Sequence, residues 1–97
     1  MNQIICNAIY NRCVLKFTYH GHPRVVEPHA HGLSQARNEV IRCYQTGGTS
    51  RSGKVPDWKL MRVDRIESLA VTKTHFVGVR NGYVKGDKGM STIFCEL

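Results

Sequence analysis

Four of the five histidines of this chain lie in one short stretch, His20–Gly32, with the sequence HGHPRVVEPHAHG. Imidazole nitrogens are common zinc ligands, so the two His-x-His pairs suggest a tetrahedral metal site as one interpretation. The spacing matches no established ligand signature, and surface histidines of a hairpin that respond to pH are the other interpretation. We favour the hairpin and predict neither a metal nor a cofactor. The four histidines are His20, His22, His29 and His31.

The arginines favour a different chemistry, the binding of phosphate groups. A guanidinium group presents a planar fork of donors that matches two phosphate oxygens at once, and an aromatic ring can stack on a nucleic-acid base. The sequence places such side chains in or beside its predicted strands. No catalytic residue is predicted. The predicted ligand-binding or nucleic-acid-binding residues are Arg24, Arg42, Tyr44, Arg62, Arg65 and Tyr19.

An alternative interpretation gives the same side chains structural roles. Arg65 then pairs with Asp64 or Glu67 at the surface, where ion pairs are common. Tyr19 and Trp58 then belong to the core, and the remaining arginines are ordinary solvated charges. The sequence leaves both interpretations open.

The pattern of the chain argues against an enzyme. Its four cysteines have no evident activating histidine partner along the sequence, and its acidic residues form no motif. The segment Gly48–Lys54, GTSRSGK, is similar to a phosphate-binding loop. Val55 and Pro56 follow, however, where the hydroxyl residue and the helix of such a loop belong. We therefore predict a protein that is not an enzyme.

Length and charge narrow the class of protein further. The chain has 97 residues, with 14 Lys and Arg against 7 Asp and Glu, and a formal net charge of +7. A chain of this length forms one small domain, and its charge attracts phosphate-bearing partners. No apolar run approaches the roughly 20 residues that a membrane-spanning helix needs. We predict a cytoplasmic protein with no membrane partner.

The cysteines agree with a reducing compartment. No secretory leader is evident, and none of the four cysteines belongs to a Cys-x-x-Cys pair. We expect reduced thiols that fill small spaces in the core. The cysteines are Cys6, Cys13, Cys43 and Cys95.

The hydrophobic period along the chain predicts the elements that position these residues. Asn2 can cap a helix over Gln3–Arg12, in which Ile5, Ala8 and Ile9 recur at the spacing of one helical face. From residue 14 the apolar residues alternate instead, which is typical of strands. Strands are predicted at residues 14–19, 24–33, 39–45, 58–63 and 69–76, with a helical turn at Asp64–Glu67 and a long loop at Thr46–Asp57.

These elements predict a mainly β architecture, with one N-terminal helix packed on a small, strongly bent barrel of about five strands. Pro28 cannot donate a ladder hydrogen bond, so it marks an edge or a bulge in its strand. Residues 77–97 are largely glycine-rich and polar, and we expect this extension to pack on the barrel. The predicted core consists of Leu15, Phe17, Val26, Ile41, Leu60, Val63, Ile66 and Val71.

Several segments together resemble a known family. The helical AIYNR, the strand LKFTYHG with Arg24 and the VEP of Val26–Pro28, and the later KLMRVDRIESLAV are similar to the WYL domain of bacteria. The resemblance covers residues 4–76, and Glu39–Ile41 replace the Trp-Tyr-Leu triplet that names the family. It implies a single WYL-like domain over residues 1–97 with an Sm-like small β-barrel.

The resemblance also implies a function. WYL domains are ligand-sensing or nucleic-acid-sensing elements in transcription factors and phage defence. Taken together with the arginines and aromatic residues, it predicts a non-enzymatic module that binds a single-stranded nucleic acid or a nucleotide-type ligand through an arginine-rich barrel face. A helix-turn-helix or defence protein supplied in trans is an expected partner. The alternative function is a protein-interaction or oligomerisation subunit of such a complex, assembled as a homo-oligomer through strand edges.

Overall fold

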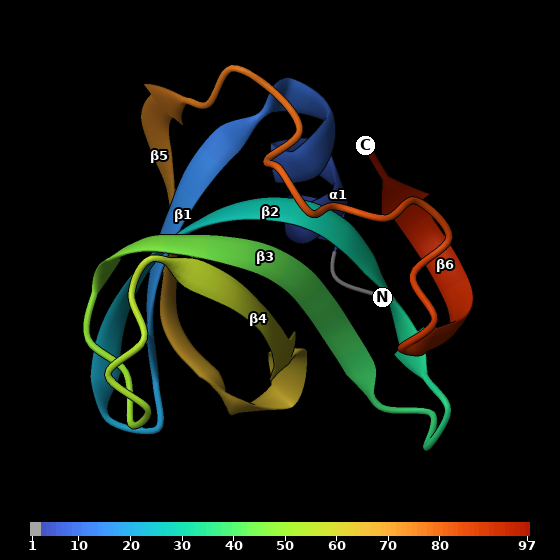
Figure 1. Ribbon diagram of the computed structural model, residues 1–97, viewed down its shortest axis with the longest axis horizontal. Helices are drawn as coiled ribbons and strands as arrows, with labels where there is room; N and C mark the ends of the chain where they lie inside the picture. The colour runs from blue at the N-terminus through green and yellow to red at the C-terminus, as the bar shows by residue number, and fades with distance from the viewer. Residues whose placement is uncertain (1–2) are drawn as a thin grey trace.

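The structure describes residues 3–97, which form one helix and six strands. It is a computed structural model, drawn as a ribbon in Figure 1. The prediction of a mainly β protein with an N-terminal helix is confirmed. In chain order the elements are α1 (Gln3–Asn11), β1 (Cys13–Tyr19), β2 (His22–Ser34), β3 (Glu39–Gly48), β4 (Asp57–Arg62), the 3-10 turn η1 (Val63–Arg65), β5 (Ile66–His75) and β6 (Met90–Glu96).

The strands form one antiparallel sheet in the order β4-β3-β2-β1-β5, and β6 pairs with β2. The long strand β2 pairs with β3 along one edge. Its other edge pairs with β1 from His22 to Val26 and with β6 from Ala30 to Ser34. The central strands bend strongly, and α1 lies behind them in the ribbon (Figure 1). Strands β4 and β5 end the order without pairing with each other in residues 3–97, so the described sheet is open.

Local sequence pattern accounts for α1 and β1. Ile5, Cys6, Ala8 and Ile9 share the buried face of α1, as their three-and-four spacing predicts. In β1 the buried residues Leu15 and Phe17 flank Lys16, which is exposed. The helix ends at Asn11, because Arg12 adopts a left-handed conformation with φ 54° that a helix cannot continue.

The predicted core is largely correct. Leu15, Phe17, Val26 and Ile41 are buried. Val63 and Ile66 are partly buried against this core. Leu60 and Val71 contradict the prediction, because they are 40% and 47% exposed. Leu60 precedes the buried Met61 on β4, and since adjacent strand residues face opposite sides, Leu60 faces outward.

Val71 lies outside because β5 does not alternate strictly. The pairing of β5 with β1 shifts register twice, and the half-buried positions of β5 recur at every third residue from Ile66. Pro28 also interrupts regular pairing, since the register of β2 against β3 shifts between Pro28 and Ala30. The predicted edge or bulge at Pro28 is therefore confirmed as an irregularity in the ladder.

The C-terminal extension contains a strand that the sequence pattern did not predict. Residues 76–89 run from the end of β5 across the molecule to β6 (Figure 1). β6 then adds to β2, and Leu97 donates a backbone hydrogen bond of 2.9 Å to the carbonyl of His29. The expected helical turn at Asp64–Glu67 is the shorter η1. None of the described helices is long and apolar enough to cross a membrane.

Candidate functional site

Arg24, one of the predicted phosphate ligands, lies inside the sheet. The residue is 5% exposed, and its Nη1 and Nη2 donate to Gln45 Oε1 and to the carbonyl of Tyr19, each at 3.1 Å. Its guanidinium carbon also lies 5.4 Å from the centre of the Tyr19 ring. Burial lowers the pKa of Arg24. Arg24 therefore connects β1, β2 and β3 from the interior.

Arg62 and Arg65 lie where β4 passes into η1, and Tyr19, the last residue of β1, contacts this junction. Tyr19 is buried, and its hydroxyl accepts a hydrogen bond of 3.1 Å from the backbone N–H of Arg62. The Arg62 guanidinium donates to the two oxygens of Asp64 at 3.1 and 2.6 Å, and this hydrogen bonding lowers the pKa of Asp64. Arg65 is exposed. The structural interpretation expected Arg65 to pair with Asp64 or Glu67. In the structure Asp64 pairs with Arg62 instead.

Arg42 lines a cavity that combines aromatic and charged side chains. The cavity has a volume of about 470 Å³. Arg42 donates from Nε to Asp87 Oδ2 at 2.6 Å and from Nη2 to Asp87 Oδ1 at 3.2 Å. Asp87 is 8% exposed, and its hydrogen bonds with Arg42 lower its pKa. The lining residues are Arg42, Trp58, Gly82, Tyr83, Val84, Asp87 and Lys88.

Two aromatic rings line this cavity, and a third contacts one of them from outside it. The rings of Trp58 and Tyr83 lie at 25° to each other with centres 6.0 Å apart, and Tyr44 meets Trp58 edge to face at 5.3 Å. Trp58 Nε1 donates to the carbonyl of Asn81 at 3.1 Å, which attaches segment 76–89 to β4. Burial raises the pKa of Tyr83 to about 12, so its hydroxyl stays protonated at neutral pH.

His29 supports these rings from inside the sheet. It is fully buried, and its ring centre lies 4.8 Å from that of Trp58 and 5.1 Å from that of Tyr83. Its Nδ1 lies 2.9 Å from the carbonyl of Glu27, and because a carbonyl only accepts, Nδ1 carries the proton. Nε2 then accepts the backbone N–H of Arg80 at 3.1 Å. Burial lowers the pKa of His29, which favours this neutral form.

The structure brings together part of the predicted site and adds residues that the prediction missed. Arg42 lines the cavity, and Tyr44 contacts Trp58 beside it, whereas the other four predicted residues lie elsewhere. Tyr83, Asp87 and Lys88 were missed because they belong to the glycine-rich extension. A weak signal existed there, since NGYVKGDKG interleaves charged and aromatic residues with glycines. The partner of Arg42, however, lies 45 residues away in sequence.

The expectation that all the cysteines are reduced is wrong. Cys6 on α1 and Cys95 on β6 form a disulfide, and Cys13 and Cys43 are free. The bonded pair is separated by 89 residues in sequence, so no short spacing identifies it. Addition of β6 to β2 places Cys95 beside α1. Burial raises the pKa of the free thiol of Cys43 to about 12.

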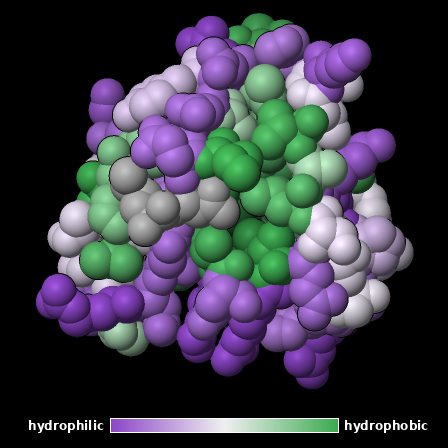
Figure 2. All heavy atoms as spheres, turned by 180° about the vertical axis from the view of Figure 1, so that it is seen from behind, coloured by the Kyte–Doolittle hydropathy of each residue, from purple (hydrophilic) through white to green (hydrophobic). Residues whose placement is uncertain are grey.

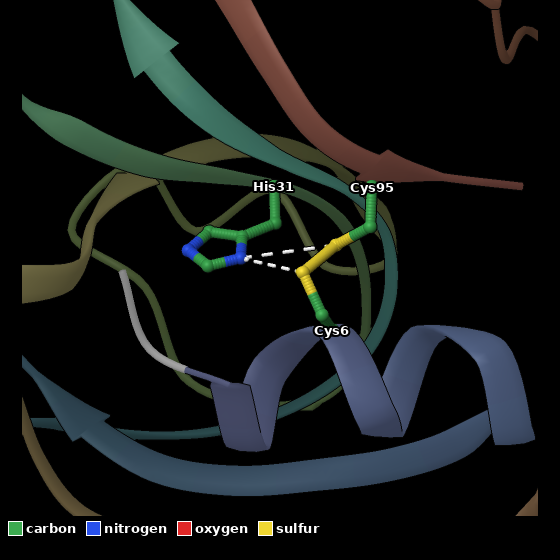
Figure 3. A group of neighbouring side chains, drawn as sticks. All are labelled: Cys6, His31 and Cys95. Carbon is green, nitrogen blue, oxygen red and sulfur yellow. Dashed lines mark hydrogen bonds between the residues drawn. A yellow bond between two sulfur atoms is a disulfide. The ribbon is translucent and has the colours of Figure 1, made fainter.

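His31 lies directly against this disulfide (Figure 3). Its Nδ1 is 3.2 Å from Cys6 Sγ and 3.8 Å from Cys95 Sγ, and its Nε2 is 2.5 Å from Glu39 Oε2. His31 is fully buried, and burial lowers its pKa. The sequence pattern gave the cysteines no histidine partner, because the contact exists only once α1 packs on β2 and β6 pairs with β2.

The histidines of the opening stretch therefore do not act as one group. His20 and His22 lie at the β1–β2 turn, where His22 Nδ1 is 2.8 Å from Thr49 Oγ1. The hairpin interpretation places these two residues correctly at the turn. It is wrong for His29 and His31, which are both fully buried and face different clusters.

Comparison of the chain with known protein families, with curated protein sequences and with solved structures finds no match. The likeness to WYL domains accordingly stays an expectation from the residues. The function has to be inferred from the geometry of the chain itself.

Proposed function

We propose that the protein is a non-enzymatic binding module for a nucleotide-type anionic ligand, held in the cavity beside Trp58 and Tyr83. The observation that carries the proposal is the meeting of aromatic rings and cationic side chains in one cavity of about 470 Å³. Cavities of this size accommodate small organic ligands. The net charge of +7 favours an anion. The ligand class includes a mononucleotide and one unstacked nucleotide of a single strand.

The lining residues divide into two roles. The rings of Trp58 and Tyr83 offer apolar faces to a base, and such stacking tolerates any base. Arg42 and Lys88 offer positive charge to the phosphate, and Arg42 adds the planar fork that matches phosphate oxygens. Asp87 competes with the phosphate for Arg42, because both of its oxygens already accept from that guanidinium. A ligand with a base and a phosphate uses both halves of the site.

The titratable groups of the cavity support a role without catalysis. General acid–base catalysis is most efficient with a group whose pKa lies near the working pH. Hydrogen bonds from Arg42 lower the pKa of Asp87, which keeps it ionised, and burial raises the pKa of Tyr83 to about 12, which keeps it protonated. Neither group exchanges its proton readily at neutral pH.

A WYL-like domain with an Sm-like small barrel is our proposal for the family and the finer fold. The curved antiparallel sheet with its N-terminal helix supports it. The corresponding proposal for the setting is a cytoplasmic module in transcription regulation or phage defence. A helix-turn-helix or defence protein is then the proposed partner.

The test uses Trp58, which is the single tryptophan of the sequence. Titration with adenosine monophosphate, a cyclic mononucleotide and a short single-stranded oligonucleotide should quench its fluorescence, and affinity should fall as salt rises. Trp58→Ala should weaken binding, measured by calorimetry, by about 5-fold to 150-fold, because one stacked base contributes about 1–3 kcal/mol. Lys88→Ala should weaken binding of every probe and reduce the salt slope by about one unit.

Lys73→Ala is the matched control. Lys73 is an exposed lysine of β5 outside the cavity, so this substitution makes the same change in charge without touching the site. It should leave affinity almost unchanged. Equal losses from Lys73→Ala and Lys88→Ala would show that the chain attracts anions without a site, and no binding at low salt would exclude the proposed function.

A second candidate function, self-association, rests on the edge of β5. This 10-residue strand pairs with β1 along one edge, and in residues 3–97 no strand pairs with its other edge. Exposed strand edges can pair with another chain. Val71 is exposed on this strand. Figure 2 shows an area of apolar side chains next to polar ones on the face opposite to that of Figure 1.

Light scattering tests self-association. A dimer or larger species should form, and Val71→Lys should convert it to a monomer, because a charge on an edge strand opposes edge pairing. Val77→Lys is the control, since Val77 is 99% exposed in the segment after β5. A wild-type protein that stays monomeric at all accessible concentrations would exclude this function and leave nucleotide binding untouched.

A further inference from the structure

Four side chains from four elements meet around the Cys6–Cys95 bond. Cys6 belongs to α1, His31 to β2, Glu39 to β3 and Cys95 to β6. The ligand atoms of Cys6, His31 and Cys95 lie within 4.8 Å of one another, and all three residues are buried. Figure 3 shows the His31 ring directed at both sulfur atoms. Histidine nitrogen and cysteine sulfur are the ligands that structural and catalytic zinc sites share.

Glu39 determines which nitrogen of His31 is available. A carboxylate only accepts hydrogen bonds, so the contact of 2.5 Å between Nε2 and Glu39 Oε2 places the proton on Nε2. Nδ1 therefore presents its lone pair, and this is the nitrogen that lies 3.2 Å and 3.8 Å from the two sulfurs. Histidines that bind metal ions usually donate their other ring N–H to a carboxylate in this way.

The spacing suits a tetrahedral ion once the two sulfurs separate. With Zn–S near 2.3 Å and Zn–N near 2.0 Å, neighbouring ligand atoms of a tetrahedral zinc site lie about 3.5–3.8 Å apart. The distances from Nδ1 to the sulfurs are already 3.2 and 3.8 Å. The Cα atoms of Cys6 and Cys95 are 5.8 Å apart, so side-chain rotation alone can open the sulfur pair to that separation.

We propose that reduction of the Cys6–Cys95 disulfide converts this cluster into a binding site for one Zn²⁺ ion, with Cys6 Sγ, Cys95 Sγ and His31 Nδ1 as ligands and Glu39 orienting His31. Within residues 3–97 no further His, Cys, Asp or Glu belongs to the ligand group. The fourth position of a tetrahedral ion is then taken by water, as in zinc sites with three protein ligands.

The two steps balance as follows. A dithiol reductant gives two electrons and two protons to the Cys6–Cys95 bond, which yields two thiols, and is itself oxidised to a disulfide. Zn²⁺ then binds both sulfurs as thiolates and releases the two protons to solvent. Bound zinc and the disulfide exclude each other. A disulfide oxidant that takes two electrons from the two thiolates and two protons from solvent, and is itself reduced to two thiols, therefore re-forms the Cys6–Cys95 bond and releases the ion.

This inference is independent of the nucleotide cavity, because it uses none of the cavity-lining residues. It bears on the proposed cytoplasmic setting, where disulfides are rare and dithiols persist. In such a compartment the cluster is reduced and metal-bound, and the disulfide forms on oxidation.

Co²⁺ serves as the spectroscopic probe for the full-length chain. The chain treated with dithiothreitol and then freed of it should bind one equivalent of Co²⁺, with a sulfur-to-cobalt charge-transfer band and the visible bands of a tetrahedral ion. Zn²⁺ should displace the Co²⁺. The oxidised chain should show none of these bands. This comparison needs no substitution, so it does not depend on how well a variant folds.

Variants then identify the ligands. Cys13→Ser combined with Cys43→Ala should keep the bands, because it removes the free thiols alone. Cys6→Ala combined with Cys95→Ala should abolish them in the reduced chain. Glu39→Gln should weaken zinc affinity by about 10-fold to 100-fold, as loss of the carboxylate partner of a metal-bound histidine does.

Two results would overturn the proposal. One is a reduced wild-type chain, folded or unfolded by circular dichroism, that binds Co²⁺ and Zn²⁺ no more tightly than the oxidised chain. The other is a tetrahedral cobalt spectrum that survives removal of Cys6 and Cys95.

Discussion

Reduction of the Cys6–Cys95 disulfide in the absence of metal should lower the free energy of unfolding by about 4 kcal/mol, because the bond closes a loop spanning 89 residues of the chain. Cross-linking positions so far apart removes a large share of the conformational freedom of the unfolded state. The bond also attaches β6, the last strand, to α1, the first element. Loss of the bond should therefore loosen both.

Denaturant unfolding of the oxidised and the reduced chain measures this effect. The variant with Cys13→Ser and Cys43→Ala should show the same difference between its two redox states, because it retains Cys6 and Cys95. An unchanged midpoint after complete reduction, verified by thiol titration, would contradict a stabilising role for the bond. If reduction lowers the free energy of unfolding only in chains that contain Cys13 and Cys43, the effect belongs to these two thiols and not to the disulfide.

Replacement of His29 by Ala should destabilise the protein by about 3 kcal/mol, because it opens a space in the core and removes two hydrogen bonds to backbone groups. The imidazole is fully buried against Trp58 and Tyr83. Its Nδ1–H donates to the carbonyl of Glu27, and its Nε2 accepts the backbone N–H of Arg80. Nucleotide affinity should fall as well, since the same ring supports the cavity.

His29→Phe separates the contribution of ring packing from that of the two hydrogen bonds, and His20→Asn is the control at an exposed histidine. Phe keeps an aromatic ring but makes neither hydrogen bond, so its cost should be smaller than that of Ala and still about 2 kcal/mol. His20 lies exposed at the β1–β2 turn with φ 52°, which Asn tolerates, so His20→Asn should stay within about 0.5 kcal/mol of wild type. Equal stability of His29→Ala and wild type, measured by denaturant unfolding, would contradict the role of His29.

Local periodicity determined the elements that the sequence predicted well. The face of α1 formed by Ile5, Ala8 and Ile9 and the alternation around Lys16 depend on neighbours three or four residues apart in a helix and two apart in a strand. Such patterns are complete within one segment. The prediction failed at Val71, where register shifts against β1 set the face, and at β6, whose pairing partner lies far away in the chain.

Charge and composition predict a class of partner but not the residues that would bind it. The sequence alone indicates a small basic domain that attracts anions. It cannot distinguish a buried arginine from a paired or an exposed one, because Arg24, Arg42 and Arg62 all lie in strands. Tertiary structure encloses Arg24 within the sheet and pairs Arg42 with Asp87.

The two clusters that carry our proposals exist only in the folded chain. Trp58 meets Tyr83 because segment 76–89 crosses the molecule, and Cys6 meets Cys95 because β6 adds to β2. His29 and His31 are two residues apart in sequence, yet they carry their protons on different ring nitrogens. A backbone carbonyl faces Nδ1 of His29, and a carboxylate faces Nε2 of His31, so each of these nitrogens holds the proton. Residue type supplied the chemistry of these groups, and contacts between distant segments decided which groups act together.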